Sequence, residues 1–140
     1  DEQGLPTRVP ADVRLTLERT ACYGTCPIYE LSIDSSGRAD LQAGRFMELE
    51  PGNYRKQLAD STLLTLYRRL ERDSIWAFEE VYDANISDVP SMILEVRAGE
   101  RQHRTKARAD YPDRIAKLFT FLEERIGVKD TARWEPVEDD

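Results

Sequence analysis

The stretch Ala21–Pro27, which reads Ala-Cys-Tyr-Gly-Thr-Cys-Pro, contains both cysteines of the chain. An extended chain would separate their Cα atoms by about 13 Å, whereas a disulfide requires roughly 4.4–6.8 Å, so a bridge needs a tight turn. Gly24 can adopt the positive φ that such a turn demands, and Pro27 disfavours a helical conformation at Cys26. We therefore predict a turn between two strands, in which Cys22 and Cys26 can meet.

The segments on both sides of this turn have the pattern of β-strands. Residues 13–18 and 29–34 alternate apolar with polar side chains, which is the period of a strand with one buried face. The sequence Ser-Ser-Gly that follows predicts a hairpin loop with Gly37 in the left-handed conformation. Pairing Asp34 with Arg38 places apolar side chains together on one face and polar ones on the other, so this register is self-consistent.

The next predicted elements are a helix and a second hairpin. Asp60 or Ser61 can cap the helix, because apolar side chains recur at helical spacing over residues 63–70. Residues 89–108 return to the strand pattern, and the Gly-Glu sequence at 99–100 fits a two-residue hairpin turn.

The clearest helical pattern lies within residues 115–126 and ends at Gly127. The predicted order is therefore βββαββα. Separate hairpins interleaved with helices favour an α+β fold, with a mainly antiparallel sheet and two helices packed on one face. We expect a single domain over residues 13–134, preceded by a flexible lead at residues 1–12 and followed by an acidic tail at residues 135–140.

The composition limits the classes of function. The chain has 140 residues, and its net charge of −7 argues against general affinity for nucleic acid, which requires an excess of lysine and arginine. Its apolar runs are far shorter than the roughly 20 residues of a membrane-spanning helix, so we expect no transmembrane segment. The acidic, proline-containing start is similar to the lead of a mature exported protein.

The cysteine pair has three interpretations. The first is a structural disulfide, whose closed loop of about five residues would stabilise the fold by roughly 2 kcal/mol. The second is a thiol-redox pair, although the usual redox motif has two residues between its cysteines and begins at a helix N-terminus. The third is a free pair or a metal contact. Since only His103 could add a soft ligand and a closed zinc site needs four, we expect no metal and no cofactor.

His103 is the only histidine, so a Ser-His-Asp or Cys-His catalytic unit would have to use it. The register of the second hairpin places His103 opposite Val96, on the apolar face. A lone histidine in this position is typical of a packed residue, and we therefore assign no catalytic residue.

One hairpin concentrates positive charge in this acidic chain. The same register places Arg97, Arg104, Lys106 and Arg108 on its polar face, with Glu95 opposite Arg104. Charges on an edge strand can simply prevent sheets from pairing with each other. The alternative is a face that binds an anionic partner, either a protein or an envelope polymer.

With these elements placed, the chain resembles a bacterial family known as domain of unknown function 6438. The signature of that family, Cys-x-Gly-x-Cys-Pro-x-Tyr, is present at residues 22–29. A second matching region contains Tyr82-Asp83 and the sequence Ser-Asp-Val-Pro at 87–90, and Trp134 after the last helix also fits.

The resemblance covers most of the chain, from about residue 13 to residue 134. It implies a disulfide between Cys22 and Cys26, and an exported protein that is periplasmic, anchored to the outer membrane or secreted. It implies no reaction, because the family has none assigned.

We therefore expect a non-enzymatic binding or interaction module of the cell envelope, stapled by the Cys22–Cys26 disulfide. One alternative is a thiol-redox or hydrolytic enzyme that uses Cys22, Cys26 or His103. Another is a structural accessory domain with no binding chemistry of its own.

Overall fold

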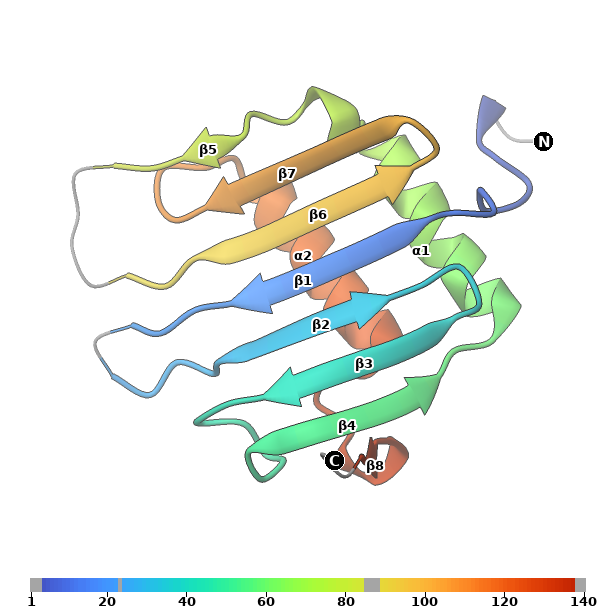
Figure 1. Ribbon diagram of the computed structural model, residues 1–140. Helices are drawn as coiled ribbons and strands as arrows, with labels where there is room; N and C mark the ends of the chain where they lie inside the picture. The colour runs from blue at the N-terminus through green and yellow to red at the C-terminus, as the bar shows by residue number, and fades with distance from the viewer. Residues whose placement is uncertain (1–3, 23, 85–88, 138–140) are drawn as a thin grey trace.

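The computed structural model describes residues 4–22, 24–84 and 89–137, which form one mixed sheet of eight strands and two α-helices (Figure 1). The strands in chain order are β1 (Arg14–Arg19), β2 (Tyr29–Ile33), β3 (Arg38–Ala43), β4 (Gly52–Gln57), β5 (Val81–Tyr82), β6 (Met92–Ala98), β7 (Arg101–Ala107) and β8 (Glu135–Pro136). The helices are α1 (Asp60–Arg72) and α2 (Asp113–Ile126), with short 3-10 helices η2 (Ile75–Ala77) and η3 (Thr131–Arg133). Across the sheet the order is β5-β7-β6-β1-β2-β3-β4-β8.

The strand pairing follows the apolar pattern of the sequence. The β2–β3 hairpin has the predicted register, with Ile33 opposite Ala39, and Gly37 in its loop has a φ of 86°. β1 lies between β2 and β6 and is antiparallel to both, while the β5–β7 pair is parallel. The predicted α+β class and the mainly antiparallel sheet are confirmed.

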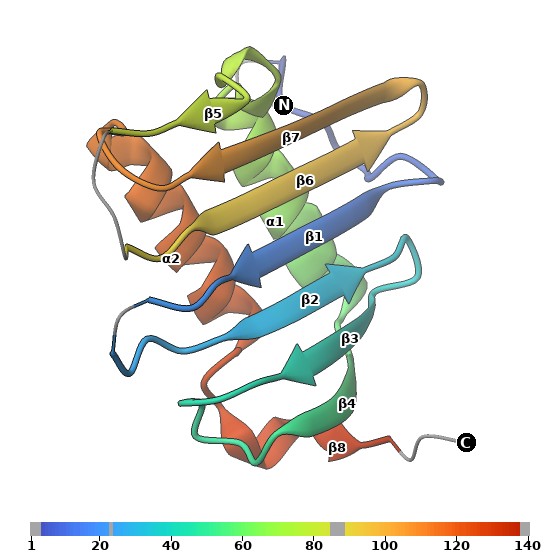
Figure 2. The same cartoon turned by 60° about the vertical axis from the view of Figure 1, so that its left-hand side comes forward.

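The core lies between the sheet and the two helices. Both helices lie behind the sheet in Figure 1 and remain on that side in the rotated view of Figure 2, and they contact each other. Leu118, Phe119 and Leu122 of α2 are buried in one cluster with the apolar face of β2. Gly127 ends α2 with a φ of 81°, as predicted. None of the helices in the described part of the chain is long and apolar enough to cross a membrane.

The predicted order βββαββα is incomplete, because it omits β4, β5 and β8. β4 reads Gly-Asn-Tyr-Arg-Lys-Gln and has no alternating apolar face, so its strand pairing depends on the neighbouring β3 rather than on burial. β5 and β8 are two-residue strands, too short to produce a periodic pattern.

The chain ends also differ from the prediction. Residues 135–136, which we expected in the acidic tail, form β8 against β4, and the preceding Trp134 is 4% exposed. The Trp134 indole nitrogen donates to the Gly127 carbonyl oxygen at 3.0 Å. At the other end, Val9 packs against the core and Arg68 donates to the Pro6 carbonyl oxygen at 2.5 Å, so this lead contacts the domain.

The predicted cap of the first helix is wrong. Ala59 occupies the N-cap position of α1, and no side chain in the described part of the chain caps it. Asp60 is instead the first helical residue, where its negative charge interacts favourably with the helix dipole.

Candidate functional site

The face of the sheet opposite the helices is the candidate site. Within the described residues no helix covers this face, which is turned towards the viewer in Figure 1. Alternate residues of seven strands project from it. Its charged residues in these strands are six cationic and five anionic ones, namely Arg14, Arg38, Arg55, Arg97, Arg104, Lys106, Glu18, Glu30, Asp40, Glu95 and Glu135. The face therefore has an excess of positive charge, although the whole chain carries −7.

Two pairs of like charges lie directly opposite each other on this face. Arg14 of β1 is opposite Arg97 of β6, and Glu18 of β1 is opposite Glu30 of β2. Like charges in this position destabilise a sheet. The two pairs lie towards opposite ends of β1, separated by four residues or about 13 Å. We call them the positive pole (Arg14, Arg97) and the negative pole (Glu18, Glu30).

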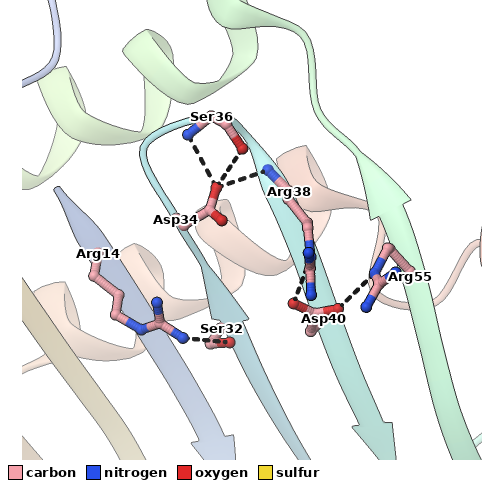
Figure 3. A network of polar contacts seen from close by, with 7 residues as sticks. All are labelled: Arg14, Ser32, Asp34, Ser36, Arg38, Asp40 and Arg55. Atoms are coloured by element: carbon pink, nitrogen blue, oxygen red, sulfur yellow. Dashed lines mark hydrogen bonds and ion pairs between the residues drawn. The ribbon is translucent and has the colours of Figure 1, made fainter. Parts of the chain in front are cut away.

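A cluster of arginines around Asp40 lies on the same face (Figure 3). The Nε atoms of Arg38 and Arg55 donate to the two carboxylate oxygens of Asp40, at 3.2 and 2.9 Å. On the other side Arg14 Nη2 donates to the Ser32 hydroxyl at 3.4 Å. Figure 3 shows that Arg14 extends from β1 towards β2 and that Arg55 extends from β4 towards β3. The guanidinium groups therefore converge from both sides on the Ser32–Asp40 pair.

These side chains border an open groove of about 520 Å³. We call it the arginine groove and define it by Arg14, Ser32, Arg38, Asp40 and Arg55, all of which line it. Glu30 and the polar side chains of Thr16, Gln42 and Asn53 also line it. The sequence prediction missed this groove, because β4 was not recognised as a strand and Arg55 could not be placed beside Asp40.

The β2–β3 loop at the end of the groove is fixed by Asp34. Its Oδ1 atom accepts hydrogen bonds from the Ser36 hydroxyl at 2.6 Å, the Ser36 amide at 2.9 Å and the Arg38 amide at 3.2 Å. These bonds, the one from the Ser36 hydroxyl first, hold the pKa of Asp34 below its usual value. The loop that precedes Arg38 is therefore held in one conformation.

The four basic residues proposed from the sequence do not form one surface group. Arg97 and Arg104 are exposed on the uncovered face, and the Glu95 carboxylate opposite Arg104 accepts instead from Gln102 at 2.6 Å.

The other two residues of the set lie beside β5: Lys106 at the edge of the uncovered face, and Arg108 directly after β7. Arg108 donates to Asp83 at 2.8 Å, and Lys106 is close enough to affect the same carboxylate. The hydrogen bond from Arg108 lowers the pKa of Asp83. Arg108 is thus paired with an acidic residue of the same domain. The residue that lies next to Arg97 on the uncovered face is instead Arg14 of β1.

The predicted disulfide between Cys22 and Cys26 is confirmed, with the two Cα atoms 5.7 Å apart. Gly24 has a φ of 152°, as the tight turn required, and its amide donates to the Cys22 carbonyl oxygen at 3.0 Å. The bridge lies in the connection between β1 and β2, beyond the negative pole.

A buried ionic cluster, not found from the sequence, anchors both ends of this connection. Arg19, the last residue of β1, donates to both carboxylate oxygens of Glu123, at 2.6 and 2.8 Å. The hydroxyl of Tyr29, the first residue of β2, donates to the same carboxylate. The hydrogen bond to Glu123 raises the pKa of Arg19, while burial and the nearby carboxylate raise that of Tyr29. No buried side-chain nitrogen or oxygen of this cluster lacks a hydrogen-bond partner among the described residues, as expected of a structural element.

His103 lies in β7 opposite Val96, on the helix-facing side, as predicted. Its Nε2 atom is buried and has no hydrogen-bond partner among the described residues. In the part of the chain that the structure describes, no group of three His, Cys, Asp or Glu side chains has the arrangement of a metal site. The second region of the resemblance lies partly outside the described residues, at 87–88.

Comparison with known proteins agrees with the resemblance drawn from the sequence. No curated protein matches the chain. A family model described as "Domain of unknown function (DUF6438)" matches residues 13–126. This range includes both α-helices and every strand of the sheet except β8. The chain therefore belongs to the DUF6438 family.

Proposed function

We propose that this chain is a non-enzymatic binding module of the bacterial cell envelope, and that the uncovered face of its sheet binds another protein. The observation that carries the proposal is the presence of two like-charge pairs on this face, the positive pole and the negative pole. Each pair reduces the stability of the isolated domain. A partner that places opposite charges over both poles would remove this repulsion, so we infer that these residues serve binding rather than folding.

The partner that we propose is a protein rather than an anionic polymer. A polymer of uniform negative charge would be repelled by Glu18, Glu30 and Glu95, which are interleaved with the arginines. A protein surface can instead present an acidic group to the positive pole and a basic group to the negative pole. Such a pattern also selects against partners that have the wrong arrangement of charge.

An exported location is part of the proposal and is supported by the disulfide. Disulfides persist in oxidising compartments and are rare in the cytosol, where thiols are kept reduced. The Cys22–Cys26 bridge therefore favours a periplasmic, outer-membrane-anchored or secreted protein.

The enzyme alternative receives less support from the geometry. Cys22 and Cys26 lie between two strands, whereas a redox-active cysteine is usually activated at a helix N-terminus. His103 lies on the helix-facing side of β7, away from the uncovered face. Neither position favours a thiol-redox or hydrolytic site.

Site-specific photo-cross-linking tests the proposed binding face. A photoreactive amino acid replaces Ser32, at the centre of the face, or Lys117, an exposed residue of α2 on the helix side. Both variants are produced in the bacterium that encodes the chain, and adducts are identified by mass spectrometry. We expect a defined protein adduct from position 32, and its loss when Arg14 and Glu30 are both changed to the opposite charge.

The outcome at position 117 is the control. Equal adducts from both positions, or no protein adduct from position 32, would contradict the proposed binding face. The structural accessory domain would then be the better description.

A further inference from the structure

We propose that the arginine groove is a binding site for an oxyanion, either a carboxylate or a phosphate group. This inference rests on the proposed function in one respect: the group that enters the groove is the anionic part of the partner. The test below uses small anions and does not depend on the identity of that partner.

The first argument is the charge that remains after the internal ion pairs are counted. Asp40 is a single carboxylate between two guanidinium groups, those of Arg38 and Arg55. One positive charge of this trio is therefore uncompensated. Arg14 adds a second, because its described contact is with the neutral Ser32 hydroxyl. Glu30 at the margin of the groove and Glu135 opposite Arg55 also lie near these arginines, but neither forms an ion pair with Arg38 or Arg55 among the described residues.

The second argument is the direction of the donors. Arg38 and Arg55 both contact Asp40 through Nε, and no hydrogen bond from their Nη atoms to another described residue is present. Two N–H groups of one guanidinium match the two oxygens of a carboxylate or phosphate, which makes such pairs stronger and more specific than a point charge. The Ser32 hydroxyl accepts from Arg14, so its own hydrogen is available as a further donor at the base of the groove.

The third argument is preorganisation. The arginines project from β1, β3 and β4 of one continuous sheet, and Asp40 holds two of them together. Exposed ion pairs of this kind contribute little to stability. Their effect here is to reduce the rotational freedom of Arg38 and Arg55 before a ligand arrives, which lowers the entropic cost of binding.

The test is a nuclear magnetic resonance titration of the full, disulfide-bonded chain. Glutarate and inorganic phosphate are added in separate series, each compared with sodium chloride at equal ionic strength. We expect saturable changes in the amide signals around Ser32, Asp40 and Arg55, and none of comparable size with chloride. The anion that binds more tightly identifies the ligand as carboxylate or phosphate, and saturation by either supports the site.

Matched variants locate the binding. Arg38→Gln with Arg55→Gln should raise the dissociation constant of the anion at least roughly tenfold, since two guanidinium groups that can each donate two hydrogen bonds are lost. Arg97→Gln with Arg104→Gln removes the same charge from the same face but outside the groove, and should change it by no more than about twofold because those charges are screened. Arg38→Lys with Arg55→Lys keeps the charge but removes the paired N–H donors of the guanidinium groups. Its affinity for the anion should therefore lie between that of the native chain and that of the double glutamine variant. Thermal unfolding establishes that each variant is folded.

Three results would overturn the inference. The first is a response to both anions that is no larger than the response to chloride. The second is a loss of anion affinity in the Arg97 and Arg104 control variant as large as that in the Arg38 and Arg55 glutamine variant. The third is native anion affinity in the double lysine variant. A cross-link at position 32 without oxyanion binding would leave the protein-binding proposal in place and remove only the groove. Oxyanion binding without any protein adduct would leave the groove in place as an anion site and remove the protein-binding proposal.

Discussion

At the scale of single residues, the β2–β3 hairpin depends on the absence of a side chain at Gly37. Its φ of 86° is in the left-handed region, and a Cβ atom there would lie 2.6 Å from the Leu58 carbonyl oxygen. The Leu58 amide also donates to the Gly37 carbonyl oxygen at 2.8 Å. The hairpin loop is therefore packed directly against the backbone that leads into α1, which places Arg38 at the end of the arginine groove.

We expect Gly37→Ala to destabilise the domain more than Gly99→Ala. Both positions have positive φ, so each substitution costs about 1–2 kcal/mol of backbone strain. Only Gly37 adds a clash with backbone, which should bring its total to roughly 2–5 kcal/mol. Gly99 has no atom within 4 Å of the added Cβ and is the matched control. Urea unfolding of both variants measures the difference, and equal midpoints would show that the loop can move away from Leu58.

At the scale of elements, the connection between β1 and β2 is held in two ways. The Cys22–Cys26 disulfide closes its turn, and the Glu123 carboxylate of α2 binds Arg19 and Tyr29 at its two ends. Breaking a buried ion pair by removing one partner generally costs more than opening a short disulfide loop. The ends of the connection should therefore stay in place when the bridge is absent.

We expect reduction of the disulfide, or the double substitution Cys22→Ser and Cys26→Ser, to lower the free energy of unfolding by only about 2 kcal/mol. The reason is that a loop of about five residues restricts the unfolded chain only modestly. Urea unfolding with and without reductant measures the effect, with the double serine variant as a control that reductant should not change. Loss of cooperative unfolding on reduction would show that the bridge, rather than the core and Glu123, holds these strands together.

At the scale of the whole molecule, the charges are distributed unevenly. The uncovered face has more cations than anions, yet the chain carries −7, so the remaining surface is strongly acidic. The like-charge pairs on the uncovered face are unfavourable for the isolated domain. Residue pairs that lower the stability of a domain are typical of functional surfaces.

This distribution predicts that Glu30→Lys stabilises the isolated domain. The substitution places a positive charge opposite Glu18 and should raise the free energy of unfolding by about 0.2–1 kcal/mol. Glu100→Lys, in the exposed β6–β7 turn, changes the net charge equally and is the control for general charge repulsion. Urea unfolding at low salt measures both variants. If the gain from Glu30→Lys did not exceed that from Glu100→Lys, the negative pole would not be a local source of instability.

The parts of the fold that were predicted correctly are those with a strong apolar period. Alternation over β2 and β3 allows only one register, because a shift by one residue would turn Leu31 towards solvent. The helical spacing of Leu118, Phe119 and Leu122 likewise predicted that α2 packs on the sheet. β4, β5 and β8 carry no such period, and the ionic cluster at Glu123 joins residues 104 positions apart in the sequence, so no local pattern could reveal them.

Local patterns in the sequence were enough to predict the β2–β3 hairpin, the turn that brings Cys22 and Cys26 together, and the helix that ends at Gly127, because each depends on local conformation or on periodic burial. The set of charges that share a face depends instead on how distant strands pair. Arg14 meets Arg97 because β1 inserts between the two hairpins, and Arg55 meets Asp40 because a polar strand pairs with β3. Pairing between strands distant in sequence depends on the packing of the whole sheet, and the candidate site is a product of that pairing.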